Sequence, residues 1–149
     1  MARPIVPDTT AFVHAIREAH QPFFDAVLRG QVWLSAVVAC ELYAGTRSAE
    51  EGRLLDRLLH GAAARDRLLV PSVEDWSAAG RLLARRVRLS GTLRPRDHLA
   101  DVLIVVSAAR VGGEILTANR AHFETWANLA RRSGMNVTVG RGEPSAWGG

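Results

Sequence analysis

Short apolar runs alternate with helical patterns along the whole chain, and this alternation constrains the fold more than any other feature. The apolar runs predict strands at residues 4–7, 32–35, 68–70, 114–117 and 136–139. Helical patterns separate them, at 9–29 with a break at Pro22, and at 36–43, 48–65, 73–90 and 120–132. Strands that alternate with helices pair in parallel and need cover on both faces. We therefore predict an α/β fold with a parallel sheet between helical layers.

Residues 99–110 fit two kinds of secondary structure. The run of apolar, mostly β-branched residues 102–106 is typical of a buried strand. However, the segment is twelve residues long, Asp101 lies near its start, and Gly112 and Gly113 follow its end, which is typical of a capped helix. We predict a buried helix, with Asp97 and Asp101 at its amino-terminal end.

The length of 149 residues suits one compact domain. We assign residues 1–139 to this domain and the Gly- and Pro-rich residues 140–149 to a flexible C-terminal tail. The apolar runs are too short for a signal peptide or a membrane span. The one cysteine, Cys40, cannot form an internal disulfide, which indicates a reducing compartment, and we interpret it as a small core residue. We expect a soluble, cytoplasmic protein with no membrane association.

Polar side chains follow the predicted strands at one edge of the sheet. Because parallel strands all point the same way, each strand end and the start of its following helix share this edge, where ligands bind in open α/β sheets. The polar residues of the edge are Asp8-Thr9-Thr10, Ser35 and Glu41, Asp97 and Asp101, and Thr117-Ala118-Asn119. His98 and His122 lie near it, where they would be solvated or contact a substrate.

Three carboxylates of this edge lie in apolar surroundings. Taken singly, Asp8 could be a helix N-cap, Glu41 a rim residue and Asp101 a residue that complements the helix dipole. Together they need a cationic partner, because the chain contains no Lys and these helices carry little Arg. Carboxylate oxygens suit Mg²⁺ or Mn²⁺, which bind through one or two carboxylates plus substrate phosphate oxygens. A divalent cation site is therefore predicted.

Four segments in order along the chain resemble the motifs of one family. Residues 5–10 (IVPDTT) resemble the first strand and Asp-Thr element of the PIN-domain ribonucleases, and residues 34–45 (LSAVVACELYAG) are similar to their Ser…Glu-Leu…Gly element. Residues 99–109 (LADVLIVVSAA) match the helix that carries the third acid, and residues 116–123 (LTANRAHF) resemble the final Thr-x-Asp/Asn…Phe element. The resemblance is closest to the short toxins of the VapC type.

This resemblance implies a three-layer α/β/α sandwich with a five-stranded parallel, Rossmann-like sheet, and Mg²⁺-dependent cleavage of RNA, with Mn²⁺ as a substitute. It implies that Asp8, Glu41 and Asp101 bind the metal, which would activate a water for in-line displacement at a phosphate, and that Asn119 occupies the fourth catalytic position. It further implies a homodimer, or a hetero-oligomer with a small cognate antitoxin that blocks the site. Additional substrate contacts are expected from Thr10, Ser35 and Thr117.

The sequence departs from the family pattern at three positions. Thr10 stands where Asn or Ser is commoner, Val38 where a Thr is frequent, and Asn119 where many relatives have Asp. Thr10 keeps a hydroxyl and Asn119 keeps a carbonyl oxygen, but Asn119 lacks the charge that would help to bind a second metal. A protein of the PIN fold that binds RNA or a partner without cleaving is the alternative.

All 19 basic residues counted as Lys or Arg are Arg, which is typical of a GC-rich genome, so their placement is more informative than their number. Residues 81–96 contain six Arg and no acid, and this stretch leads directly to the predicted acidic edge. A solvated helix face usually mixes charges of both signs. We therefore expect contacts to RNA phosphates, the alternative being a solvated or partner-facing surface. The residues expected to make these contacts are Arg85, Arg88, Arg94 and Arg96.

Overall fold

The strands of the protein are short, and all of their pairings are parallel. The computed structural model describes residues 2–140, in which the strands are β1 (Ile5–Pro7), β2 (Leu34–Ser35), β3 (Leu68–Leu69), β4 (Glu114–Leu116) and β5 (Thr138–Val139). β4 pairs with β1 on one side and with β5 on the other, and β2 pairs with β3. Each predicted strand is therefore present, although all five are shorter than predicted.

The single five-stranded sheet is not observed, because the strands form one sheet of three and another of two. The two sheets meet at one parallel bridge between Ile5 and Val32, where the Trp33 N–H donates to the Ile5 carbonyl at 2.9 Å. Beyond this point the chain turns at Ser35 into a helix. This early turn leaves too few residues to extend the ladder between β1 and β2.

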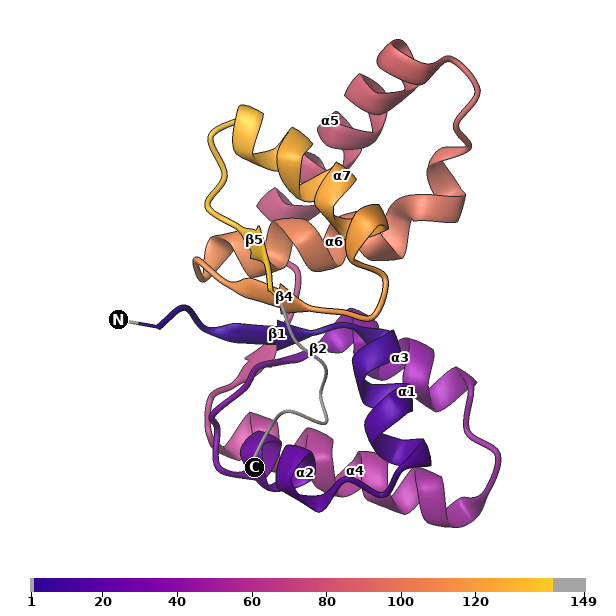
Figure 1. The fold of residues 1–149 in the computed structure, drawn as a ribbon, viewed down its shortest axis with the longest axis vertical. Coiled ribbons are helices and arrows are strands. Elements are labelled where there is room, and N and C mark those ends of the chain that lie inside the picture. Colours follow the sequence, from indigo (N-terminus) through magenta and orange to yellow (C-terminus); the bar gives the residue numbers. More distant parts are fainter. Residues whose placement is uncertain (1, 141–149) are drawn as a thin grey trace.

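Helices cover both faces of the strands. α1, α2, α3 and α4 lie on one side, and α5, α6 and α7 lie on the other (Figure 1). α5 packs extensively along α6, which also contacts α7 and α3. The helices are α1 (Thr9–Arg17), α2 (Gln21–Leu28), α3 (Ala36–Ala44), α4 (Ala49–Ala64), α5 (Val73–Ser90), α6 (Pro95–Arg110) and α7 (Arg120–Arg132). The expected helical layers on both faces are thus observed.

Local sequence signals explain where several helices begin and end. The side chains of Ser72 and Asp75 form a reciprocal capping box at the start of α5, and Gly91 ends that helix in the left-handed conformation, with φ of 78°. Pro22 lies in the first turn of α2, where its missing N–H costs no hydrogen bond. The predicted break at this proline is confirmed.

Residues 99–110 are helical, as predicted, and belong to the longer helix α6. Residues 102–108 are all buried, because α6 lies between α5, α7 and α3. A helix covered on all sides needs no polar stripe, which explains its strand-like apolar run. The one polar side chain among these buried residues, Ser107, has its hydroxyl hydrogen-bonded, because it donates to the Leu103 carbonyl at 2.6 Å.

Two sequence expectations about burial need correction. Cys40 is exposed rather than in the core, because α3 turns Val38 and Leu42 inward while Cys40 and Glu41 face outward. Gly140, assigned to the flexible tail, is buried and donates its N–H to the Ile115 carbonyl at 2.8 Å. The rest of that predicted tail lies outside the described residues. Among residues 2–140, no helix has both the length and the apolarity to cross a membrane.

Candidate active site

Asp8 lies directly after β1 and is the most buried acid of this edge, with 2% of its surface exposed. Its Oδ1 accepts hydrogen bonds from the Ala11 N–H at 2.9 Å and the Thr10 hydroxyl at 2.7 Å, so the carboxylate also caps α1. Burial raises the pKa of Asp8 above its ordinary value, and the charge of Asp101 raises it further, while the three hydrogen bonds to the carboxylate oppose this rise.

Two threonine hydroxyls tie the loop after β4 to Asp8. The Thr117 hydroxyl donates to Asp8 Oδ2 at 2.6 Å and accepts the Asn119 N–H at 2.9 Å. The Thr10 hydroxyl, besides its bond to Asp8, accepts the Ala118 N–H at 3.1 Å. The Asn119 side chain is exposed at the start of α7 and makes no capping hydrogen bond. Its amide is therefore available to a ligand at this edge.

Glu41 comes from α3 and is exposed on the side of the site that faces α1. Its Oε1 accepts a hydrogen bond from the Thr9 hydroxyl at 2.7 Å. Ser35, predicted to contact substrate, is fully buried, and its Oγ accepts the Val38 N–H at 3.3 Å as the N-cap of α3. The structure thus gives Ser35 a capping contact away from solvent, and it adds Thr9 as the partner of Glu41.

Asp101 lies in the second turn of α6 and is paired with a histidine. Its Oδ2 lies 2.7 Å from Nε2 of His122 on α7, and both side chains are about one-third exposed. The His122 ring lies near the His98 ring, with 5.8 Å between centroids, and His98 in turn lies 5.7 Å from the buried ring of Trp126. The sequence placed both histidines near this edge, but gave no sign of the pairing.

The acids do not form a closed set of metal ligands. Asp8 and Asp101 interact electrostatically, yet no group of three His, Cys, Asp or Glu side chains within residues 2–140 is arranged to hold a metal ion. Glu41 is turned toward Thr9 and Asp101 toward His122. The donors are nevertheless all hard oxygens, and no Arg in residues 2–140 pairs with any of the three acids. This donor chemistry fits a divalent cation.

The Arg-rich stretch divides into two parts. Arg94 and Arg96 lie at the exposed start of α6, within two turns of Asp101. Arg85 donates to the hydroxyl of Ser133, which lies just beyond the carboxyl end of α7, at 3.0 Å. Arg85 and Arg88 also line a cavity of about 390 Å³ at this end of α7. Asn119 precedes the other end of α7, whose 13 residues span about 20 Å. Arg85 and Arg88 therefore lie away from the acids, and their expected contacts to RNA phosphates stay a prediction.

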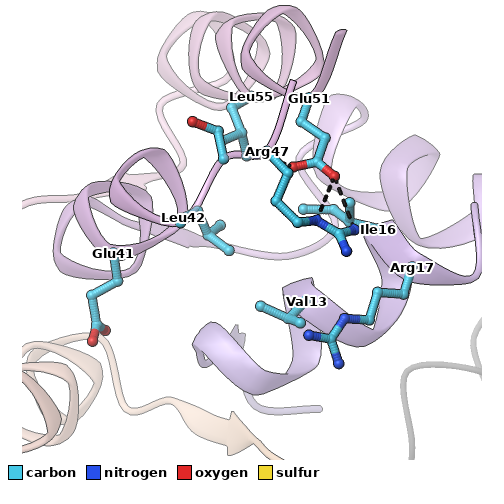
Figure 2. Close-up of a pocket in the computed structure, with 10 residues that line it drawn as sticks. Val13, Ile16, Arg17, Glu41, Leu42, Arg47, Glu51 and Leu55 are labelled. Atoms are coloured by element: carbon cyan, nitrogen blue, oxygen red, sulfur yellow. Dashed lines mark hydrogen bonds and ion pairs between the residues drawn. The ribbon is translucent and has the colours of Figure 1, made fainter. Parts of the chain in front are cut away.

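A second pocket begins at Glu41 and was not foreseen from the sequence. It has a volume of about 250 Å³ and lies between α1, α3 and α4. Figure 2 shows the guanidinium group of Arg17 at this pocket, and that of Arg47 paired with Glu51. Aliphatic side chains form much of the lining, from Val13, Ile16, Leu42 and Leu55. The pocket thus joins an apolar lining to charged groups beside the acidic edge.

An exposed apolar surface adjoins the site on the other side of Glu41. Trp76 is 51% exposed, and it borders a cavity of about 350 Å³ whose walls are almost wholly apolar. Val70 and Val73, close to it in sequence, are 55% and 82% exposed. Exposed apolar groups gathered in this way are typical of a protein interaction site. The cavity is further lined by Val37, Cys40, Leu99 and Leu103.

Comparisons with known proteins agree with this architecture. The PIN domain family model matches residues 5–129, and the chain therefore belongs to the PIN domain family. Among solved structures, VapBC from Salmonella typhimurium bound to DNA is similar, with a TM-score of 0.64 and 18% identity over 93% of this chain and 98% of that one. FitAB bound to an IR36 DNA fragment has a TM-score of 0.62 and 18% identity over 95% of each chain.

A third similar structure is VapBC2 from Rickettsia felis bound to a promoter fragment, with a TM-score of 0.56 and 19% identity over 81% of this chain and 91% of that one. At these identities the likeness concerns the fold. No curated protein matches the sequence.

Proposed function

We propose that this protein is a metal-dependent endoribonuclease that acts as a toxin of the VapC type. The observation that carries the proposal is the electrostatic interaction of Asp8 and Asp101 at one strand edge, with Glu41 bound to Thr9, the residue after Asp8, and with no Arg paired to these acids among residues 2–140. Asp8, Glu41 and Asp101 would hold the cation, Mg²⁺ or its substitute Mn²⁺, and Asn119 would complete the catalytic set. The similar solved structures, which are VapBC and FitAB assemblies, support this assignment.

The protein groups of the site have distinct tasks in this proposal. The bound cation would supply Lewis-acid stabilisation of the charge that develops on a scissile phosphate. The Thr10 and Thr117 hydroxyls hold both oxygens of Asp8 in place, so the buried carboxylate is oriented before a ligand arrives. The exposed Asn119 amide can donate to a phosphate oxygen, and Arg94 and Arg96 can contact the neighbouring phosphates of the strand.

Metal dependence is the first test. We expect the purified protein to cleave total cellular RNA in Mg²⁺ or Mn²⁺, to lose that activity in excess EDTA, and to regain it when Mn²⁺ is restored. The readout is the appearance of new RNA ends. Cleavage that continues undiminished in EDTA would contradict the proposal, because the reaction would then need no bound cation.

A small antitoxin is the proposed partner, and the pocket beside Glu41 is where we expect a part of it to bind. The aliphatic lining suits an apolar side chain, while Arg17 at the pocket suits an acidic group of the same segment. A chain bound there would lie next to the acids and would exclude RNA from them. The neighbouring reading frame is the natural source of this partner, and its product should suppress the cleavage defined above.

We further propose that the apolar surface around Trp76 joins two copies of the chain. Trp76→Glu places a charge in that interface and is expected to convert a dimer to a monomer at micromolar concentration, measured by light scattering after size exclusion. Leu89→Glu is the matched control, since Leu89 is also an exposed apolar residue of α5, 63% exposed, but lies outside this surface. Equal oligomeric states of wild type and Trp76→Glu would contradict the interface.

The alternative function is RNA or partner binding without cleavage. Asn119 in place of an acid favours it, as does the lack of a closed group of three metal-binding side chains in the described residues. Calorimetric titration separates the two functions. No detectable Mn²⁺ binding, together with RNA affinity that falls steeply with salt, would favour the binding module.

A further inference from the structure

His122 joins the amino ends of two helices at the acidic edge. It lies three residues after Asn119, and therefore on the same side of α7 as this amide. Its Nε2 lies 2.7 Å from Oδ2 of Asp101, which projects from α6. Within residues 2–140, the other oxygen, Oδ1, has no hydrogen bond to the protein. One oxygen of Asp101 is thus held by His122 while the second is free for a ligand.

The ring of His122 is itself held in place. It packs edge-on against the Phe123 ring, with 5.7 Å between the ring centroids. The centroid of the His98 ring is 5.8 Å away, and the planes of the two imidazoles make an angle of 34°. His98 lies against Trp126, whose side chain is 2% exposed and belongs to the core. A series of rings therefore connects the core to the imidazole that contacts Asp101. Such support restricts the imidazole to few orientations.

We propose, on the basis of the function proposed above, that His122 is a positioning residue: its Nε2–H donates to Asp101 Oδ2 and directs Oδ1 toward a divalent cation. An imidazole can make this bond without the permanent charge of a Lys or Arg, so Asp101 keeps its negative charge available to the cation. Hydrogen bonds of this kind to metal ligands typically strengthen metal binding by about 10- to 100-fold.

Mn²⁺ affinity without RNA provides the test, measured calorimetrically on the intact chain. We expect His122→Ala to bind Mn²⁺ about 10- to 100-fold more weakly. His122→Gln, whose amide N–H reaches the place of Nε2, is expected to recover most of this loss. His60→Ala is the control, because His60 is exposed on α4. In cleavage assays, His122→Ala should need more Mn²⁺ for half-maximal rate and approach the wild-type rate at saturation.

The outcomes separate this inference from the proposed function. Wild type that neither binds Mn²⁺ nor cleaves RNA would overturn both. Wild type that binds Mn²⁺, with His122→Ala binding equally or more tightly, would overturn only the role of His122. A nitrogen-15 spectrum of the metal-free protein tests the bond itself, even if His122→Ala fails to fold. The spectrum should show the Nε2–H tautomer of His122, and Asp101→Asn should shift it; an unshifted signal would overturn the proposal.

Discussion

Asp8→Asn is expected to abolish RNA cleavage and, at the same time, to make the metal-free protein more stable. The loss of activity follows from the proposed role of Asp8 as a metal ligand. Electrostatic stabilisation by a bound cation is worth several kcal/mol, and its loss corresponds to a rate reduced by about a thousandfold or more. The substitution keeps the shape of the side chain, and asparagine caps helices as well as aspartate does. The Ala11 N–H therefore keeps its acceptor.

The gain in stability follows from the direction of the Asp8 pKa shift. The pKa is raised on folding, chiefly by burial, so the folded protein binds this proton more tightly than the unfolded chain does. The contribution of Asp8 to stability is therefore complete below the ordinary pKa of an aspartate, and is lost as the pH rises through the raised value. At neutral pH the buried charge opposes folding. Asp8→Asn removes that charge and should raise Tm in EDTA at pH 7.

Thermal unfolding with and without metal checks both parts of this prediction. Mg²⁺ should raise the Tm of wild type, since a ligand present at 100 times its Kd stabilises the folded state by about 2.7 kcal/mol. Mg²⁺ should leave the Tm of Asp8→Asn nearly unchanged. Asp66→Asn is the control, because Asp66 is exposed and its φ of 57° is readily adopted by asparagine. RNA cleavage that survives Asp8→Asn would contradict the assignment of the site.

The positions of the acids could be predicted because they depend on periodicity and strand direction. Once β1 and α6 are placed in the sequence, Asp8 and Asp101 must lie at the same edge of parallel strands. The buried helix α6 was also predictable, from its length and from the two glycines that follow it. These features need no knowledge of which side chains touch one another.

Features that depend on packing between distant segments could not be predicted. Glu41 pairs with Thr9 and Asp101 with His122, and both pairs join residues at least 21 positions apart. The sequence showed that the Arg-rich stretch leads to the acids, but not that α5 is long enough to carry Arg85 to the far end of α7. The burial of Ser35 and the exposure of Cys40 likewise follow from how α3 is rotated against its neighbours.

Thr117→Val is expected to weaken both stability and activity, although Thr117 is not a proposed metal ligand. The hydroxyl donates to the buried carboxylate of Asp8 and accepts the Asn119 N–H. Valine has no hydroxyl, so the charged carboxylate loses a donor and the Asn119 N–H loses its acceptor. Loss of hydrogen bonds to a buried charged group costs about 1–3 kcal/mol. Cleavage at limiting Mn²⁺ should fall by about 10- to 100-fold, because the orientation of Asp8 is no longer fixed.

The Thr117 hydroxyl also lowers the pKa of Asp8, so its removal should raise that pKa further. In EDTA, the stability lost as the pH rises from the ordinary pKa of an aspartate, 3.8, to neutrality should therefore be larger for Thr117→Val than for wild type, measured by chemical denaturation. Thr117→Ser keeps the hydroxyl and is the matched control, which separates the hydrogen bond from the loss of a methyl group. If Thr117→Val and Thr117→Ser behave alike in stability and in Mn²⁺ dependence, the contact between Thr117 and Asp8 has no part in preparing the site, and the orientation of Asp8 must depend on Thr10 and the Ala11 N–H alone.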